Sequence, residues 1–213
     1  ILGAGTGESN LFFNVMLHVG TLVAVVAFYH KLVWDLIKEF FLMLKDIFTG
    51  KFKWSKMNYN RNLVVMLIIG LIPLFLLFLP IPGTDMKLKD LGDRLSASPV
   101  LIVTACSLIL TSVLLTIGII RNRKSVASTH KHLATKSNAK ATRDNFNVVD
   151  AILVGVTQVC AALLPGLSRS GSTLSVGEMR GISKQKALDY TFVLGIPSIL
   201  AAALLEGVDA IKS

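Results

Sequence analysis

The sequence predicts an all-α fold, a polytopic transmembrane helical bundle that forms one integral membrane domain over residues 1–213. The first observation is composition: the mean hydropathy is +0.64 and 16% of the residues are charged, whereas soluble domains carry about a quarter. The second is that the apolar residues gather in blocks of roughly 20, the length an α-helix needs to cross a bilayer. The third is that the net charge of +9 sits between the blocks, as in the cytoplasmic loops of membrane proteins.

The first part of the chain predicts a loop, a span and an interfacial helix. Residues 1–10 are small and polar, so we expect a loop there. Residues 11–30 are apolar and long enough to cross a bilayer. Residues 31–48 are amphipathic with a helical period, and Trp34 suits the depth of lipid headgroups, so this helix is expected at the membrane interface. With the basic residues that follow, it forms an amphipathic, basic segment over 31–61.

The middle of the chain predicts two further spans. Residues 62–80 form an apolar block in which Pro73 introduces a kink that membrane helices tolerate. Residues 81–98 carry balanced charge and predict a loop, and residues 99–120 form the next span. Residues 121–147 are basic and rich in Ser and Thr, so a flexible loop is expected there.

The segment 148–182 predicts a re-entrant helix hairpin rather than a full crossing. Residues 148–164 are apolar and follow a basic segment, and the last span, residues 187–206, also starts beside lysines. Because both ends of the segment then face the same side, the chain must enter and return, with its turn near Pro165–Gly171. Non-helical backbone at membrane depth requires protein or a wet cavity around it.

Lys and Arg counts set the expected orientation. Residues 31–61 and residues 121–147 each carry seven, whereas residues 81–98 carry three, matched by three aspartates. The first two segments are therefore predicted to be cytoplasmic and the third to face outward. No nucleic-acid partner is expected, because the basic residues are not accompanied by an aromatic platform or a groove-reading motif.

Two stretches resemble each other at an offset of 177 residues: residues 13–25 and residues 190–202. In the predicted topology they cross the membrane in opposite directions, which makes them an inverted repeat and favours a site near the midplane. The segment before the second copy contains Pro165–Thr173. Its counterpart would lie upstream of Ile1, so we expect the chain to be a fragment that lacks material at both ends.

Residues 165–173, PGLSRSGST, carry the clearest chemical signal. Arg169 is a permanent cation with apolar sequence on both sides, and a charge inside a membrane lines a cavity or pairs with something. Hydroxyls surround it, and the nearby glycines let backbone N–H groups approach a ligand. Arginine, hydroxyls and free N–H groups together form a phosphate cradle. The alternative is that the small residues permit close helix packing while Arg169 snorkels to the interface.

Other polar residues in the spans give weaker signals. His18 and Gln158 are secondary candidates for phosphate binding, and helix-packing hydrogen bonds are the alternative for both. Glu178 is either an acid, base or metal ligand, or a side chain in cytoplasmic water. Cys106 and Cys160 lie outside any metal-binding or redox motif, and we expect both to be buried as small hydrophobic residues. No residue is assigned as a metal ligand.

The motif PGLSRSGST, the stretch GISKQKALDYTFVLGIPSILAA and the opening FNVMLHVGTLVAVVAFYHKL resemble the undecaprenyl-diphosphate phosphatase family of the bacitracin-resistance type. The resemblance implies a multi-pass protein of the bacterial plasma membrane. Its activity would be hydrolysis of the polyprenyl lipid undecaprenyl diphosphate to the monophosphate and phosphate, which recycles the lipid carrier for peptidoglycan synthesis and confers bacitracin resistance. It also implies a divalent cation, magnesium or calcium, as cofactor. Substrate and membrane lipids are the expected partners, and a homodimer stays open as an alternative to a monomer.

The same resemblance implies roles for individual residues. Arg169 would bind the diphosphate as the catalytic cation, Ser168 and Thr173 would assist binding, and Ser170 and Gly171 would shape the turn. The family's first signature, an acidic stretch ending in a Pro-x-Ser-Ser-Thr-Gly-His pattern, does not occur in this sequence, so the isolated chain is expected to be inactive. A lipid-phosphate transporter or flippase is the alternative function, because the same cradle can hold a headgroup without cleaving it, and a structural membrane subunit is a third.

Overall fold

The computed structural model describes residues 7–50, 57–80, 83, 86–97, 101–132 and 143–212, and these residues contain helices and no strand. The predicted all-α class is therefore confirmed. The helices, in chain order, are α1 (Gly7–Phe28), α2 (His30–Phe48), α3 (Tyr59–Leu71), the 3₁₀ helix η2 (Ile72–Phe78), α4 (Leu88–Ala97), α5 (Leu101–His132), α6 (Val148–Leu163), α7 (Arg169–Met179) and α8 (Lys184–Lys212).

Three stretches are long and apolar enough to cross a membrane: Tyr59–Phe78, Leu101–Asn122 and Lys184–Leu204. They match the predicted spans 62–80, 99–120 and 187–206. A fourth is added if α1 and α2 are taken as one span, but the two helices meet at an angle of 86°. The protein is thus a polytopic helical membrane protein, and α2 leaves the direction of the first apolar helix, as the amphipathic pattern predicts.

Proline modifies the helix of the second predicted span. Pro73 occupies the start of η2, where the α-helical pattern of α3 changes to a 3₁₀ helix. Proline has no N–H for the helix ladder and its ring crowds the preceding turn, so the chain tightens there. Pro73 thus coincides with a change of helix type, whereas the predicted kink stays a prediction.

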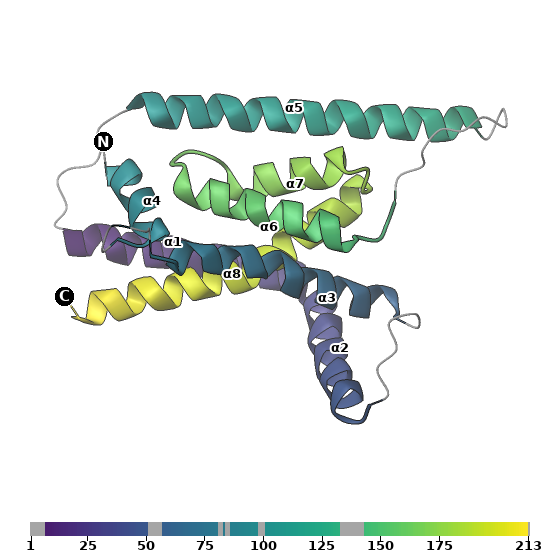
Figure 1. Cartoon of the computed structure of the whole chain (residues 1–213), viewed down its shortest axis with the longest axis horizontal. Coiled ribbons are helices and arrows are strands. Elements are labelled where there is room, and N and C mark those ends of the chain that lie inside the picture. The colour runs from purple at the N-terminus through teal and green to yellow at the C-terminus, as the bar shows by residue number, and fades with distance from the viewer. Residues whose placement is uncertain are drawn as a thin grey trace.

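The helix ends separate into two groups (Figure 1). α3 and α6 begin, and α5 ends, at one end of the bundle, whereas η2, α4 and the start of α5 lie at the other. The described parts of the two basic segments, residues 31–50, 57–61, 121–132 and 143–147, therefore lie toward the end opposite to residues 86–97, which is consistent with the charge counts. α1 and α8 lie against each other and run in opposite directions, as expected for an inverted repeat.

Three segments predicted as loops contain helix. α1 already begins at Gly7, within the loop predicted for residues 1–10. α4 occupies most of residues 81–98: the Asp90 side chain accepts a hydrogen bond from the Lys87 N–H at 2.7 Å, and the glycine of this helix packs against the α6 backbone. α5 continues to His132, through half of the loop predicted for 121–147, because residues 121–132 contain neither glycine nor proline to stop it. Residues 133–142 lie outside the described part.

The two ends of the hairpin α6–α7 are joined at the same end of the bundle. The Arg143 N–H donates to the Gly181 carbonyl at 2.8 Å, and the Ser183 N–H donates to the Arg143 carbonyl at 2.9 Å. Asp150, fully buried at the start of α6, accepts from Arg143 at 3.0 Å and from Arg180 at 2.7 Å. The chain thus enters and returns, which is the geometry that a re-entrant segment requires.

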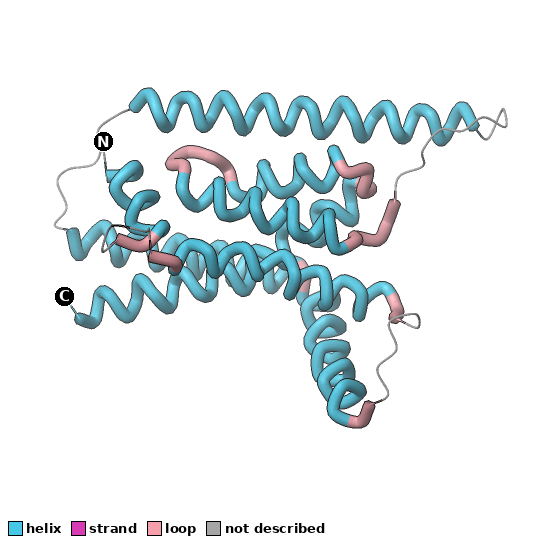
Figure 2. The backbone as a smooth tube through the Cα atoms, in the orientation of Figure 1, coloured by secondary structure: helices cyan, strands magenta, loops and turns pink. Residues whose placement is uncertain are grey.

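The turn of this hairpin (pink between α6 and α7 in Figure 2) lies far from its joined ends. Gly166 has a φ of 86°, a left-handed conformation that glycine adopts without strain. A Cβ atom there would also lie 2.9 Å from Thr104 Cγ2, so the turn packs closely on α5. The predicted turn near Pro165–Gly171 is correct, except that α7 already begins at Arg169.

Both cysteines are exposed free thiols, so the prediction that they are buried is wrong. Cys106 lies on α5 and Cys160 on α6, and neither is buried in the protein. The error follows from the solvent: in a membrane protein the outer surface of an apolar helix contacts lipid, so an apolar neighbourhood in sequence does not imply burial in the protein.

Candidate active site

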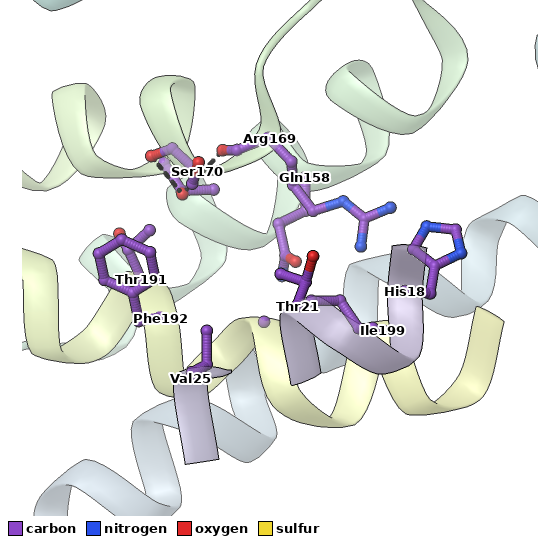
Figure 3. Close-up of a pocket in the computed structure, with 11 residues that line it drawn as sticks. His18, Thr21, Val25, Gln158, Arg169, Ser170, Thr191, Phe192 and Ile199 are labelled. Atoms are coloured by element: carbon purple, nitrogen blue, oxygen red, sulfur yellow. Dashed lines mark hydrogen bonds between the residues drawn. The ribbon is translucent and has the colours of Figure 1, made fainter. Parts of the chain in front are cut away.

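A cavity of about 310 Å³ lies between α1, α6, α7 and α8. Figure 3 shows how its side chains converge from helices that are far apart in the sequence. The lining residues are His18, Thr21 and Val25 from α1, Gln158 from α6, Arg169, Ser170 and Thr173 from α7, and Thr191, Phe192, Gly195 and Ile199 from α8. The structure therefore gathers five of the residues that the sequence singles out: His18, Gln158, Arg169, Ser170 and Thr173.

Arg169 is the cation of this cavity. It is the first residue of α7 and is half-buried. Its guanidinium extends across the cavity toward the His18 imidazole of α1 (Figure 3), and it makes no hydrogen bond or ion pair with the residues that the structure describes. A guanidinium away from bulk water needs an anionic partner, and its fork of N–H donors matches phosphate oxygens. An anionic group of a ligand is the partner that this position fits.

The amino end of α7 adds backbone and hydroxyl groups. The N–H groups of Arg169 and Ser170 occupy the first two helical positions, which have no intrahelical acceptor. The Thr173 hydroxyl donates to the Arg169 carbonyl at 2.9 Å and to the Ser170 carbonyl at 3.2 Å (dashed lines in Figure 3), so its oxygen remains available only as an acceptor. The Ser170 hydroxyl is exposed to the cavity and has no hydrogen bond within the described residues. Ser170 is therefore the better donor to an anion.

Ser168 and Gly171 do not line the cavity. The Ser168 Oγ caps α7 by accepting the Gly171 N–H at 3.1 Å, and the Ser168 N–H donates to Thr111 of α5 at 3.1 Å. A Cβ atom on Gly171 would lie 3.3 Å from Thr111 Cγ2. These two residues hold the start of α7 against α5, so they position Arg169 rather than face a ligand. Close helix packing, the alternative given for this motif, thus describes the face of α7 that contacts α5. The phosphate cradle describes the face that lines the cavity.

Gln158 contributes a buried amide to the cavity wall. Its side chain is 1% exposed, and its Nε2 has no hydrogen-bond partner among the described residues. A buried amide without a partner costs free energy unless a ligand or water satisfies it. Within the cavity, Gln158 is therefore a further donor for an anionic group.

Two hydroxyls of the cavity, Thr21 and Thr191, escape the sequence analysis. Both lie in the stretches that carry the repeat and the resemblance, but neither residue is singled out there. A Thr in an apolar helix more often bonds its own backbone, as Thr21 does to the Leu17 carbonyl at 2.8 Å. The inverted repeat could have indicated which part of α8 faces the site. Its offset of 177 residues pairs His18 with Gly195, and both line the cavity.

Glu178 lies away from the cavity, buried between α7 and α5. It is 2% exposed, and a Cβ atom on Gly118 of α5 would lie 2.8 Å from one carboxyl oxygen. Neither oxygen has a hydrogen-bond partner within the described part of the chain. Of the two alternatives for Glu178, the one in which it faces cytoplasmic water is therefore wrong, because α5 covers this side of α7.

The cavity walls carry positive charge without a carboxylate. Over the described residues, no group of three or more His, Cys, Asp or Glu side chains gathers to hold a metal ion. Magnesium and calcium are bound through oxygen ligands in which carboxylates predominate. The residues described here therefore do not by themselves fit a divalent cation, whereas they do fit an anion.

Comparison with known proteins identifies the family of this chain. A family model described as Bacitracin resistance protein BacA matches residues 1–213. A protein of Bacteroides fragilis (strain YCH46) named undecaprenyl-diphosphatase is 32% identical over 207 residues, which cover 97% of this chain and 63% of that protein. An undecaprenyl-diphosphatase of Alkaliphilus metalliredigens is 33% identical over 203 residues, 95% of this chain and 64% of that protein. The chain thus spans slightly less than two thirds of the length of these relatives.

Proposed function

Because this chain belongs to the bacitracin resistance protein BacA family, we propose that it takes part in the hydrolysis of undecaprenyl diphosphate to undecaprenyl phosphate and phosphate. Its relatives carry the name of that activity. The observation that supports the proposal most directly is Arg169, a cation without a protein partner in the described structure, on the wall of a cavity between apolar helices. The proposed location is the bacterial plasma membrane.

The proposed role of the cavity is to bind and orient the diphosphate. Arg169 holds the phosphate oxygens, while the Ser170 hydroxyl, the Gln158 amide and the first N–H groups of α7 donate further hydrogen bonds. Phosphoryl transfer needs little covalent chemistry from the protein: most of the catalysis is positioning and stabilisation of charge on the phosphoryl oxygens. The apolar residues of the cavity, Val25, Phe192 and Ile199, suit the first isoprenoid units of the lipid.

Phosphate release provides the test of this function. The purified chain is compared with a chimera that also carries the parts of the Bacteroides fragilis relative outside the matched region. We expect the chimera to release phosphate from undecaprenyl diphosphate in detergent and the chain alone to bind the lipid. Absence of both hydrolysis by the chimera and binding by the chain would refute the proposal.

The same experiment separates hydrolysis from transport. Binding of the lipid diphosphate without release of phosphate, together with movement of the lipid between the leaflets of a vesicle, would favour the transporter alternative. Dependence on a divalent cation remains a prediction, and chelation by EDTA in the chimera assay tests it. The homodimer, too, remains a prediction, which the mass of the protein in detergent would test.

A further inference from the structure

Helix α2 is oriented unlike the membrane-spanning helices. It meets α1 at 86°, and Figure 1 shows it projecting sideways from the bundle, whose long axis follows α3, α5 and α8. If those helices run along the membrane normal, α2 lies roughly in the plane of the membrane. One long side of it faces the bundle and the other faces whatever surrounds the protein.

The bundle side of α2 contacts α3 through buried apolar side chains and ion pairs. Leu36 and Met43, seven residues apart, are 6% and 5% exposed and pack against α3. Glu39 and Asp46, also seven apart, accept from the Arg61 guanidinium of α3 at 3.2 Å and 2.8 Å. Arg61 is thus neutralised within the protein, and the acidic side chains that pair with it face away from the outer side of α2.

The outer side of α2 carries two adjacent stripes with the same spacing of seven residues. Lys31, Lys38 and Lys45 form the first, and all three are exposed. Trp34, Phe41 and Phe48, each three positions after a lysine, form the second and are 59%, 64% and 87% exposed. Side chains three or four positions apart are neighbours on a helix. The Lys38 ammonium lies 5.4 Å from the centre of the Trp34 ring, so the two stripes touch.

The lysine stripe has an excess of positive charge. Lys31, Lys38 and Lys45 form no ion pair with any residue that the structure describes. Asp35 is the acidic residue on this side, and it too is without an ion pair there. Three lysines against one aspartate leave a net positive face beside a row of aromatic rings.

We infer that the outer face of α2 binds anionic phospholipids of the bilayer surface, with the rings of Trp34, Phe41 and Phe48 inserted at the level of the headgroups and Lys31, Lys38 and Lys45 on the lipid phosphates. Aromatic residues prefer this depth, and lysine stems run along apolar surface while their ammonium groups reach polar headgroups. Lysines near an anionic leaflet add affinity through charge, which salt screens. This inference does not depend on the proposed enzymatic function.

A bilayer fits this face better than a soluble acidic partner. The lysines alone would suit either, but a partner in water leaves the aromatic stripe exposed to solvent. The lipid interface satisfies both stripes at once, and the orientation of α2 presents them along their whole length. A soluble partner would produce no preference between lipid headgroups.

Quenching of Trp34 fluorescence by brominated lipids reads out the lipids at this face. The chain contains two tryptophans, so Trp54→Phe leaves Trp34 as the single reporter. The purified protein is placed in mixed bilayers in which either phosphatidylglycerol or phosphatidylcholine is brominated. We expect phosphatidylglycerol to be enriched roughly fivefold beside Trp34 over its share of the bilayer, and high salt to reduce this enrichment.

Matched variants assign the enrichment to the lysine stripe. Changing Lys31, Lys38 and Lys45 together to Gln should bring the enrichment close to onefold while quenching by phosphatidylcholine persists. The control changes three cations at the other end of the bundle, Lys87, Lys89 and Arg94, to Gln and should leave the enrichment unchanged.

Several outcomes would overturn the inference. The inference would be refuted if the two lipids quenched Trp34 in proportion to their shares of the bilayer when Lys31, Lys38 and Lys45 are intact. It would also be refuted if phosphatidylglycerol stayed enriched after all three lysines are changed to Gln. Protection of Trp34 from both lipids would also refute it. The salt dependence requires no change at the stripe, so it tests the inference even if the triple variant folds poorly.

Discussion

The two arginines at the ends of α7 differ in their surroundings more than in their chemistry. Arg180, at the carboxyl end, donates to Asp150 at 2.7 Å, and this carboxylate is fully buried and also bound by Arg143. Arg169, at the amino end, faces a cavity without a partner in the described structure. A cation beside apolar helices is thus structural when the fold supplies its counter-charge, and is a candidate ligand site when no side chain of the described structure pairs with it.

The largest expected effect is at the paired end. Asp150→Ala removes the carboxylate that both Arg143 and Arg180 bind, together with its part in the capping of α6. Breaking a buried pair by removing one partner costs about 3–5 kcal/mol. Unfolding by SDS in mixed micelles measures this loss. A variant as stable as the parent would show that the ion pairs do not hold the hairpin closed.

Arg169→Ala should act on function and leave stability nearly unchanged. Removal of a group that stabilises transition-state charge lowers turnover by about 10²–10³-fold. The measurement is phosphate release by the chimera, with the unfolding midpoint as its control. Arg169→Lys should recover only part of the activity, because one ammonium cannot replace a bidentate fork. Near-parental turnover in Arg169→Ala would break the contrast between the two arginines.

Glu178 extends the comparison to a third charged side chain of α7. It is buried without a hydrogen-bond partner in the described structure. Glu178→Gln keeps the shape and removes the ability to ionise. A carboxyl group buried without a partner must give up its charge on folding, which a neutral amide need not do, so we expect unfolding to become harder by about 1 kcal/mol. Unfolding by SDS in mixed micelles measures whether the variant is more or less stable than the parent. A marked loss of stability would mean that the carboxyl group has a partner, such as an internal water.

The smallest effect is expected at Arg143. Its side chain is 37% exposed, and Arg180 still neutralises Asp150 when Arg143 is lost. Arg143→Ala should therefore cost no more than about 1 kcal/mol, as for other exposed ion pairs. A loss as large as that of Asp150→Ala in the same unfolding assay would assign the closure of the hairpin to Arg143 rather than to the shared carboxylate.

The local pattern of apolar and charged residues predicts most of the helices. It fails where the outcome depends on which residues are buried in the folded protein. The spans can be predicted because about 20 consecutive apolar residues satisfy their backbone hydrogen bonds in a bilayer by forming a helix. The loops predicted over 81–98 and 121–147 are partly helical, because polarity reports exposure and does not report whether a helix ends. The exposed thiols of Cys106 and Cys160 show that in a membrane protein an apolar neighbourhood is no evidence of a protein core.

The candidate site divides in the same way. Arg169, Ser170 and Thr173 are recognisable because a charge and hydroxyls in an apolar segment are costly and therefore informative. Ser168 and Gly171 belong to the same motif and yet pack on α5, because successive residues of a helix point in different directions. Thr21 and Thr191 carry no local signal and join the cavity only through the packing of α1 and α8.

The amino-acid sequence by itself determines that this chain crosses a membrane several times, that residues 148–182 double back and that one arginine stands in apolar surroundings. It does so because hydrophobic length and charge position are properties of consecutive residues. Tertiary structure alone decides that Arg180 is neutralised and Arg169 is not. The counter-charge on Asp150 comes from another helix, and only the packing of α6 against α7 brings it within hydrogen-bonding distance of one end of α7.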